Sequence, residues 1–129
     1  ASLARLLMNA GRPEESIPLY KKAIRLNPYA HAAPYYNFGY ALWMIGKYEE
    51  ALAAGKEARI RSPNDIFSHI LLAVTYIELG RGEEARASAA EVLRIKSDLT
   101  LEWLAKMVPW KNKDDVDRLI GDLRMAGLK

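Results

Sequence analysis

The sequence predicts an all-α fold built as a superhelix of stacked helical hairpins. Three observations lead to this prediction. Apolar residues recur at helical spacing along most of the 129 residues, and glycines interrupt the pattern at regular intervals. Gly11, Gly46 and Gly80 are separated by 35 and 34 residues, and glutamates and small residues repeat with the same period. A fixed period of this length is typical of hairpins that bury their apolar faces against one another.

The clearest unit is the middle one, Tyr35–Pro63. Its apolar residues predict a first helix that Gly46 ends and a second helix that begins near Tyr48 and stops before the proline. Gly39 and Gly55 lie on the inner faces of these two helices, where small residues let backbones approach closely.

Residues 1–10 are expected to form a shortened first helix, which Gly11 ends. When this helix is aligned with the middle unit, the counterpart of Tyr35 falls before residue 1. We therefore expect the chain to be a piece of a longer protein. Pro13, followed by two glutamates, starts the second helix of this unit, which runs to Asn27.

The third unit covers 64–97, and Asn64 or Asp65 is expected to cap its first helix. After Ser97 the period stops. Asp98 or Thr100 can cap a short helix that Pro109 ends, and residues 114–126 form an amphipathic helix. An atypical terminal element of this kind covers the last exposed face of a stack. We therefore divide the chain, as one domain, into three repeats and a cap: 1–30, 31–63, 64–97 and 98–129.

The order of residues in the middle unit resembles the tetratricopeptide repeat. It has an aromatic residue at Tyr35, a glycine at the turn, a second aromatic at Tyr48, then Glu-Ala, a further alanine and a closing proline. The outer units depart from this order, because Pro13 and Gly82 stand in place of Tyr48 and His69 stands in place of Tyr35. The resemblance covers about residues 1–97. It implies a right-handed superhelix that serves as a non-catalytic scaffold for a protein or peptide partner, with no cofactor.

The tail carries a second resemblance. It is similar to the carboxyl terminus of certain bacterial multidomain signalling proteins, in which an adenylate/guanylate cyclase domain or a winged-helix DNA-binding domain precedes a tetratricopeptide region. The matching residues are Pro109, Trp110, Lys111, Asp114, Asp115, Leu123, Arg124, Ala126, Gly127 and Leu128. The resemblance implies a cyclase-type parent protein or, alternatively, a winged-helix transcriptional regulator. None of the residues that perform cyclase chemistry or read DNA occurs in this chain.

Composition limits the function classes. The formal net charge is only +3, and basic and acidic residues are interleaved, which argues against nucleic-acid binding as the main role. The absence of cysteine excludes a disulfide framework and a thiolate metal site, and it fits a reducing compartment such as the cytoplasm. No apolar run approaches the roughly 20 residues needed to span a bilayer, so we expect no membrane insertion.

Nothing in the sequence predicts an active site, a cofactor site or a metal site. Acidic pairs recur at the start of each second helix, where negative charge suits the helix dipole, and we interpret them as structural. These pairs are Glu14/Glu15, Glu49/Glu50 and Glu83/Glu84. The two histidines, His31 and His69, are isolated from other metal ligands. A cluster of three aspartates lacks the glycine and the terminal glutamate of a calcium loop: Asp114, Asp115 and Asp117.

The resemblance to stacked hairpins implies a concave groove lined by the first helix of each unit. The candidate protein-binding residues in this groove are Tyr36, Tyr40, Trp43, Met44, Phe67, Ile70, Val74 and Ile77. If all were exposed, they would exceed the few hundred Å² of apolar patch that a monomer usually tolerates.

Four alternatives stay open for what covers the groove. The first is the chain's own tail, through Leu101, Trp103, Leu119, Ile120 and Leu123. The second is a partner helix or peptide held by the aromatic side chains. The third is a second copy of the chain, forming a homodimer. In the fourth, the groove residues pack mainly among themselves.

Overall fold

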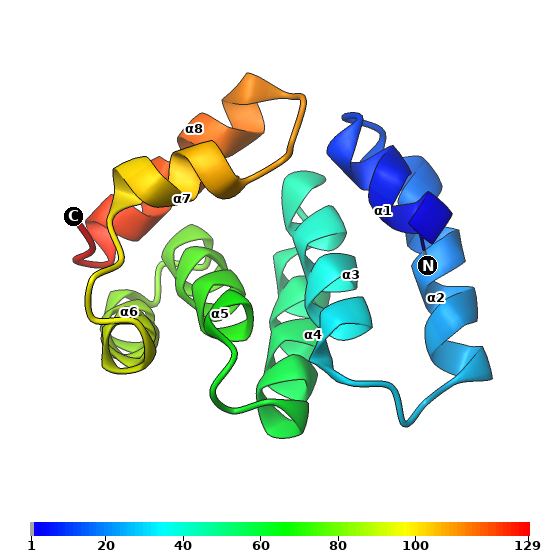
Figure 1. The fold of residues 1–129 in the computed structure, drawn as a ribbon, viewed down its shortest axis with the longest axis horizontal. Coiled ribbons are helices and arrows are strands. Elements are labelled where there is room, and N and C mark those ends of the chain that lie inside the picture. Colours follow the sequence, from blue (N-terminus) through cyan, green and yellow to red (C-terminus); the bar gives the residue numbers. More distant parts are fainter. Residues whose placement is uncertain (1) are drawn as a thin grey trace.

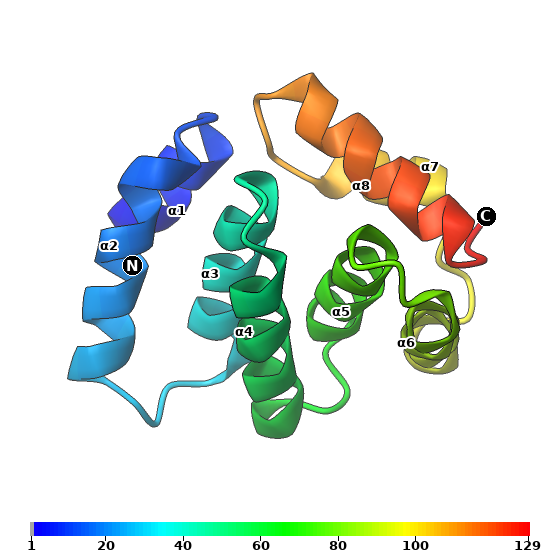
Figure 2. The ribbon, with the colours of Figure 1, turned by 180° about the vertical axis from the view of Figure 1, so that it is seen from behind.

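The computed structural model of the chain describes residues 2–129, and over that range it contains eight α-helices and no strand. The helices are α1 (Ser2–Asn9), α2 (Pro13–Leu26), α3 (Ala32–Met44), α4 (Tyr48–Arg61), α5 (Ile66–Glu78), α6 (Gly82–Ile95), α7 (Leu101–Met107) and α8 (Lys113–Met125). Successive hairpins follow one another around an arc, and α7 and α8 lie across its far end, with α8 beside α5 (Figures 1 and 2). The predicted all-α superhelical fold is confirmed.

The same tight turn follows α1, α3, α5 and α8. Each of these turns has a glycine with φ between 74° and 105°, a left-handed conformation that strains other residues. After α3, the Lys47 amide donates to the Leu42 carbonyl at 2.9 Å, a bond that closes the end of the helix. Equivalent bonds follow the other three helices, from Arg12 to Leu7, from Arg81 to Tyr76 and from Leu128 to Leu123. The glycine period in the sequence is therefore the period of this turn.

Side-chain caps fix where several helices begin. Asp65 rather than Asn64 caps α5, because its carboxylate accepts a hydrogen bond from the Phe67 amide at 2.9 Å. Thr100 rather than Asp98 caps α7, through a 3.1 Å bond from the Trp103 amide. Both alternatives that the sequence left open are thereby decided.

Helix α5 forms the centre of the protein. Its residues from Ser68 to Tyr76 are all buried, because α3, α4, α6 and α8 each pack against it. A helix that is apolar on nearly every face is typical of such a central position. The main core extends from Met8 in α1 through α5 to Leu128 after α8, so the tail shares one core with the repeats.

A very close approach between neighbouring hairpins lies at Gly39 in α3. A Cβ atom placed there would lie 2.3 Å from Leu71 Cδ2 and 3.3 Å from the Cβ of Ala54. Both neighbours are buried, Leu71 completely, so they have little room to move. The absent side chain at position 39 is therefore what allows α3 to pack onto α4 and α5.

A matched pair of substitutions tests this packing. We expect Gly39→Ala to lower the free energy of unfolding by about 1–2 kcal/mol, because overpacking outweighs the gain in helix propensity. Gly121 in α8 has no atom within 4 Å of its Cβ position. Gly121→Ala should therefore raise the same free energy by about 0.5–1 kcal/mol. Urea denaturation of the two variants measures both effects, and a stabilised Gly39→Ala protein would show that this contact is loose.

Candidate functional site

The eight predicted groove residues all lie on α3 and α5, but they differ in burial. Tyr36, Met44, Phe67 and Ile77 are half-buried. Tyr40, Trp43, Ile70 and Val74 are buried, and Trp43 and Val74 have no exposed surface at all. The structure therefore divides the predicted groove into an outer half that solvent reaches and an inner half that is covered.

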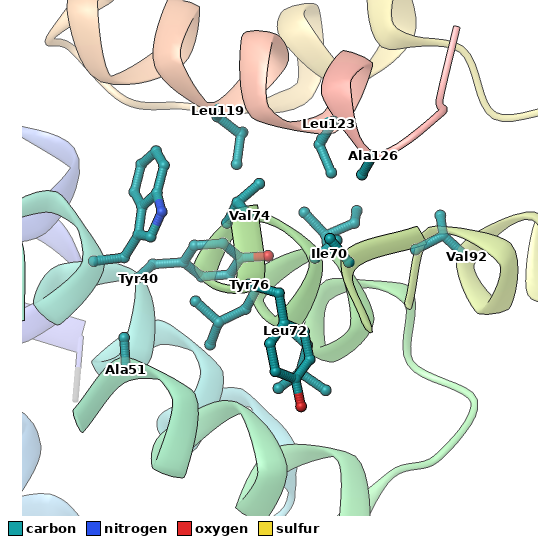
Figure 3. Close-up of a cluster of buried hydrophobic side chains, with 14 of the residues drawn as sticks. Tyr40, Ala51, Ile70, Leu72, Val74, Tyr76, Val92, Leu119, Leu123 and Ala126 are labelled. Atoms are coloured by element: carbon teal, nitrogen blue, oxygen red, sulfur yellow. The ribbon is translucent and has the colours of Figure 1, made fainter. Parts of the chain in front are cut away.

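The inner half is covered by the chain's own tail. Leu119 and Leu123 of α8, and Ala126 just after it, point toward α5, which carries Ile70 and Val74 (Figure 3). The sequence offers five tail residues as a possible cover. Leu101, Leu119 and Leu123 are buried in the common core, while Trp103 and Ile120 are partly buried against it.

Two side chains of the tail pack directly against Trp43. The Trp110 ring lies 6.2 Å from the Trp43 ring and 5.6 Å from the Tyr40 ring, measured between centroids. The Arg118 guanidinium lies 3.9 Å above the Trp43 ring, and its Nη2 donates to the Trp43 carbonyl at 2.7 Å. The Trp43 indole N–H is buried without a hydrogen-bond acceptor among residues 2–129.

An ionisable cluster lies where α8 crosses α5. Arg118 Nε is 3.8 Å from Glu78 Oε2, and Asp122 is only 7 % exposed beside them. Burial, followed by a side-chain hydrogen bond to Glu78 and repulsion from its charge, raises the pKa of Asp122 to about 8, although Arg118 acts in the opposite direction. Nothing in the sequence indicates this cluster, since Asp122 occupies an ordinary position in an amphipathic helix.

Tyr36 and Phe67 of the outer half line a pocket of about 450 Å³ between α1, α3, α5, α7 and the α7–α8 linker, and Tyr40 and Ile70 line its floor. Its walls are mainly apolar, and among the described residues that line it Arg5 alone is charged. Tyr36 and Phe67 form one aromatic wall, with ring centroids 5.8 Å apart. The end of α7 and the linker that follows it also line the pocket, through Met107, Val108, Pro109 and Trp110.

Two tyrosines supply polar groups to this pocket. The Tyr40 hydroxyl donates to the Phe67 carbonyl at 2.7 Å, which ties α3 to α5 at the pocket. Burial raises the pKa of Tyr36, and the nearby Asp65 raises it further while Arg5 lowers it. Tyr36 is therefore neutral near pH 7 and can donate a hydrogen bond. The pocket thus combines aromatic surface with hydrogen-bonding groups and one positive charge.

Both histidines have structural contacts. The His31 side chain caps α3 by accepting a hydrogen bond from the Ala33 amide at 3.3 Å. His69 is buried, and its Nε2 lies 2.7 Å from the Pro63 carbonyl. Tyr35 makes the equivalent contact one unit earlier, donating to the Pro28 carbonyl at 3.0 Å. The histidine therefore takes over the hydrogen bond of the aromatic residue that it replaces.

The acidic pairs also have local partners. Glu15 pairs with Arg12, Glu84 with Arg81 and Glu50 with Lys47, each three residues earlier at the start of its helix. In the part of the chain that the structure describes, no three His, Cys, Asp or Glu side chains lie together as a metal site would need. No described helix has the length and hydrophobicity of a membrane span.

Comparison with known proteins agrees with this architecture. Two family models described as tetratricopeptide repeat match residues 2–66 and residues 42–106. The chain belongs to the tetratricopeptide repeat family. Repeats of this family generally mediate protein–protein interaction and act as non-catalytic scaffolds. No curated protein matches the sequence.

Solved structures of tetratricopeptide repeat proteins share the fold. The crystal structure of MamA is similar with a TM-score of 0.73 and 21 % identity, over 97 % of this chain and 72 % of MamA. TTC0263, a thermophilic repeat protein of Thermus thermophilus, is similar with a TM-score of 0.72 and 19 % identity, over 97 % of this chain and 70 % of its own. At these identities the likeness concerns the fold alone.

Proposed function

We propose that this tetratricopeptide repeat domain is a non-catalytic binding module that holds a protein or peptide partner in its apolar groove. The observation that carries the proposal is the open pocket beside Tyr36 and Phe67. A large apolar side chain of a partner would be buried there between aromatic rings, which is how a few residues supply most of the binding energy in many interfaces. The positive charge of Arg5 favours a partner segment that also carries an acidic residue.

We further propose that the module serves a larger bacterial signalling protein of the adenylate/guanylate cyclase type, in the cytoplasm. The support is the sequence resemblance of the tail, in particular the Pro-Trp-Lys segment and the Leu-Arg-x-Ala-Gly-Leu end. A winged-helix transcriptional regulator is the alternative parent, because the same resemblance includes it.

A second candidate function is an autoinhibitory or purely structural domain that its own tail seals. The observation that favours it is the cover that α8 forms over Ile70 and Val74. In this alternative the groove stays closed and no partner enters it. The two functions differ in a simple way, since only the first predicts that a free peptide binds.

Selection of peptides from a displayed random library tests the proposed function. We expect the selected peptides to share a large apolar residue close to an acidic one. Phe67→Ala should weaken their binding by about tenfold or more, since it removes one aromatic wall of the pocket while changing only a half-buried residue. Isothermal titration calorimetry measures the change.

The matched control is Ile60→Ala, which truncates a side chain that is 70 % exposed on α4, outside the pocket. Binding should be unchanged in this variant. Peptides that bind the Phe67→Ala and wild-type proteins equally would contradict the assignment of the pocket. Failure to select any peptide would favour the sealed, structural alternative.

A further inference from the structure

Helix α8 buries a carboxyl group in the contact that holds it on the repeats. The charged groups that act on Asp122 are Glu78 of α5 and Arg118 of its own helix, and the Tyr48 hydroxyl of α4 also feels its charge. Asp122 directly precedes Leu123, one of the apolar residues of α8 that cover the inner half of the groove.

The cluster has too little positive charge to neutralise the buried Asp122 as well as the partly buried Glu78. Arg118 is largely committed to Trp43, through the bond to its carbonyl and the contact with its ring. Its Nε is 3.8 Å from Glu78, beyond hydrogen-bond distance, and has no hydrogen-bond partner among the described residues. Asp122 Oδ2 is also buried without a donor within residues 2–129. A carboxyl group buried without a donor is more stable in its protonated, neutral form.

We propose that α8 is a proton-operated cover of the groove: a proton on the buried Asp122 carboxyl holds the helix on α5, and its loss releases the helix and exposes Trp43 and Val74. For the partner that would then enter, the inference rests on the function proposed above. It goes beyond that function because it names the residues and the signal that open the inner half of the groove.

The direction of the pH effect follows from the burial of the Asp122 carboxyl group when α8 is docked. Its pKa is raised from 3.8 to about 8 while α8 is docked, and it returns to the ordinary value when the helix leaves and the carboxyl meets water. Docking is therefore strongest below about pH 4 and weakens as the pH rises toward 8. For one proton the docking constant falls about tenfold per pH unit in the middle of this window and less steeply near pH 8, so it falls about 50-fold between pH 6 and pH 8.

Thiol labelling can measure this opening, since the chain contains no cysteine. Ala126→Cys places a thiol in the buried contact after α8, where the native alanine is only 2 % exposed. Ala53→Cys on the exposed face of α4 corrects for the pH dependence of the maleimide reaction itself. Ala58→Cys, at a fully buried position on α4, reports unfolding of the repeats.

We expect the labelling rate at position 126, divided by that at position 53, to rise about 50-fold from pH 6 to pH 8. The rate at position 58 should not rise with it. Asp122→Asn, which keeps the side chain neutral, should make the ratio at position 126 independent of pH. Glu78→Gln removes the neighbouring negative charge, so the rise in the labelling ratio at position 126 should occur at lower pH. This variant tests the same proposal if the Asp122→Asn protein does not fold.

A ratio that stays flat in the native chain would overturn the proposal, as would an equal rise in the Asp122→Asn variant. An equal rise at position 58 would also overturn it, because it would mean global unfolding rather than release of α8. No partner takes part in this experiment. Its failure therefore leaves the peptide-binding result untouched, and the failure of peptide binding leaves the labelling result interpretable.

Discussion

Replacing Trp43 by alanine should lower the free energy of unfolding by about 3–5 kcal/mol, a loss typical of large buried side chains. Trp43 has no exposed surface, and it contacts Trp110 and Arg118 of the tail as well as the core of the repeats. Its removal would leave a cavity between α3 and α8 and would take away the ring on which the arginine rests. Chemical denaturation, followed by circular dichroism, measures the loss.

Trp43→Phe is the matched control. It keeps an aromatic ring in place and removes an indole N–H that is buried without an acceptor in the described part of the chain. We expect a smaller loss, about 1–2 kcal/mol. If Trp43→Ala were as stable as the native protein, the residue would not belong to the core, and its role as a binding residue in an open groove would gain support. With α8 docked on α5, Trp43 is covered, so it can meet a partner only after α8 has moved.

Ending the chain at Val108 should cause it to associate in solution. The truncation removes Trp110 and α8 and so uncovers the buried residues Tyr40, Trp43, Ile70 and Val74. Added to Tyr36 and Phe67, they would form a continuous apolar patch larger than monomers usually expose. We expect the mass measured by light scattering to be about twice that of one truncated chain or more, since a second copy offers the same patch.

The full chain is the control for the truncated protein. We expect the full chain to have the mass of one copy, because its tail covers this surface. A truncated protein that is helical by circular dichroism and still monomeric would show that the uncovered residues repack among themselves. A full chain that is already dimeric would show that the outer half of the groove, rather than the inner half, supports assembly.

The repeating part of the fold could be predicted from the sequence because its signals are local. The turn glycines adopt left-handed conformations that few other residues accept, so their spacing reports the hairpins directly. Likewise, His69 takes the place of Tyr35 in the next unit. Each of these side chains forms a hydrogen bond with a proline carbonyl that lies just before its helix. Such features repeat with the period, and a period can be read without knowing any tertiary contact.

The tail and the site could be predicted only in part, because they depend on contacts between distant segments. An amphipathic stripe shows that α8 buries one face, but it does not show which surface receives that face. The predicted groove residues lie on α3 and α5, yet their division into open and covered halves follows from where Leu119 and Trp110 pack. The burial of Asp122, and the effect of Glu78 on its carboxyl group, are likewise visible only after α8 is placed on α5.

The linker before α8 also touches the opposite end of the arc. The Lys111 amide donates to the Asn9 carbonyl of α1 at 2.7 Å, and Asn112 lies next to Gly11. In an open solenoid each unit contacts only its neighbours, so the end units fray independently. Here the first and last helical pairs share a contact, which couples their fraying and raises the cooperativity of the whole array. Any condition that changes the rate of amide hydrogen exchange in α1 should therefore change the rate in α8 in the same direction.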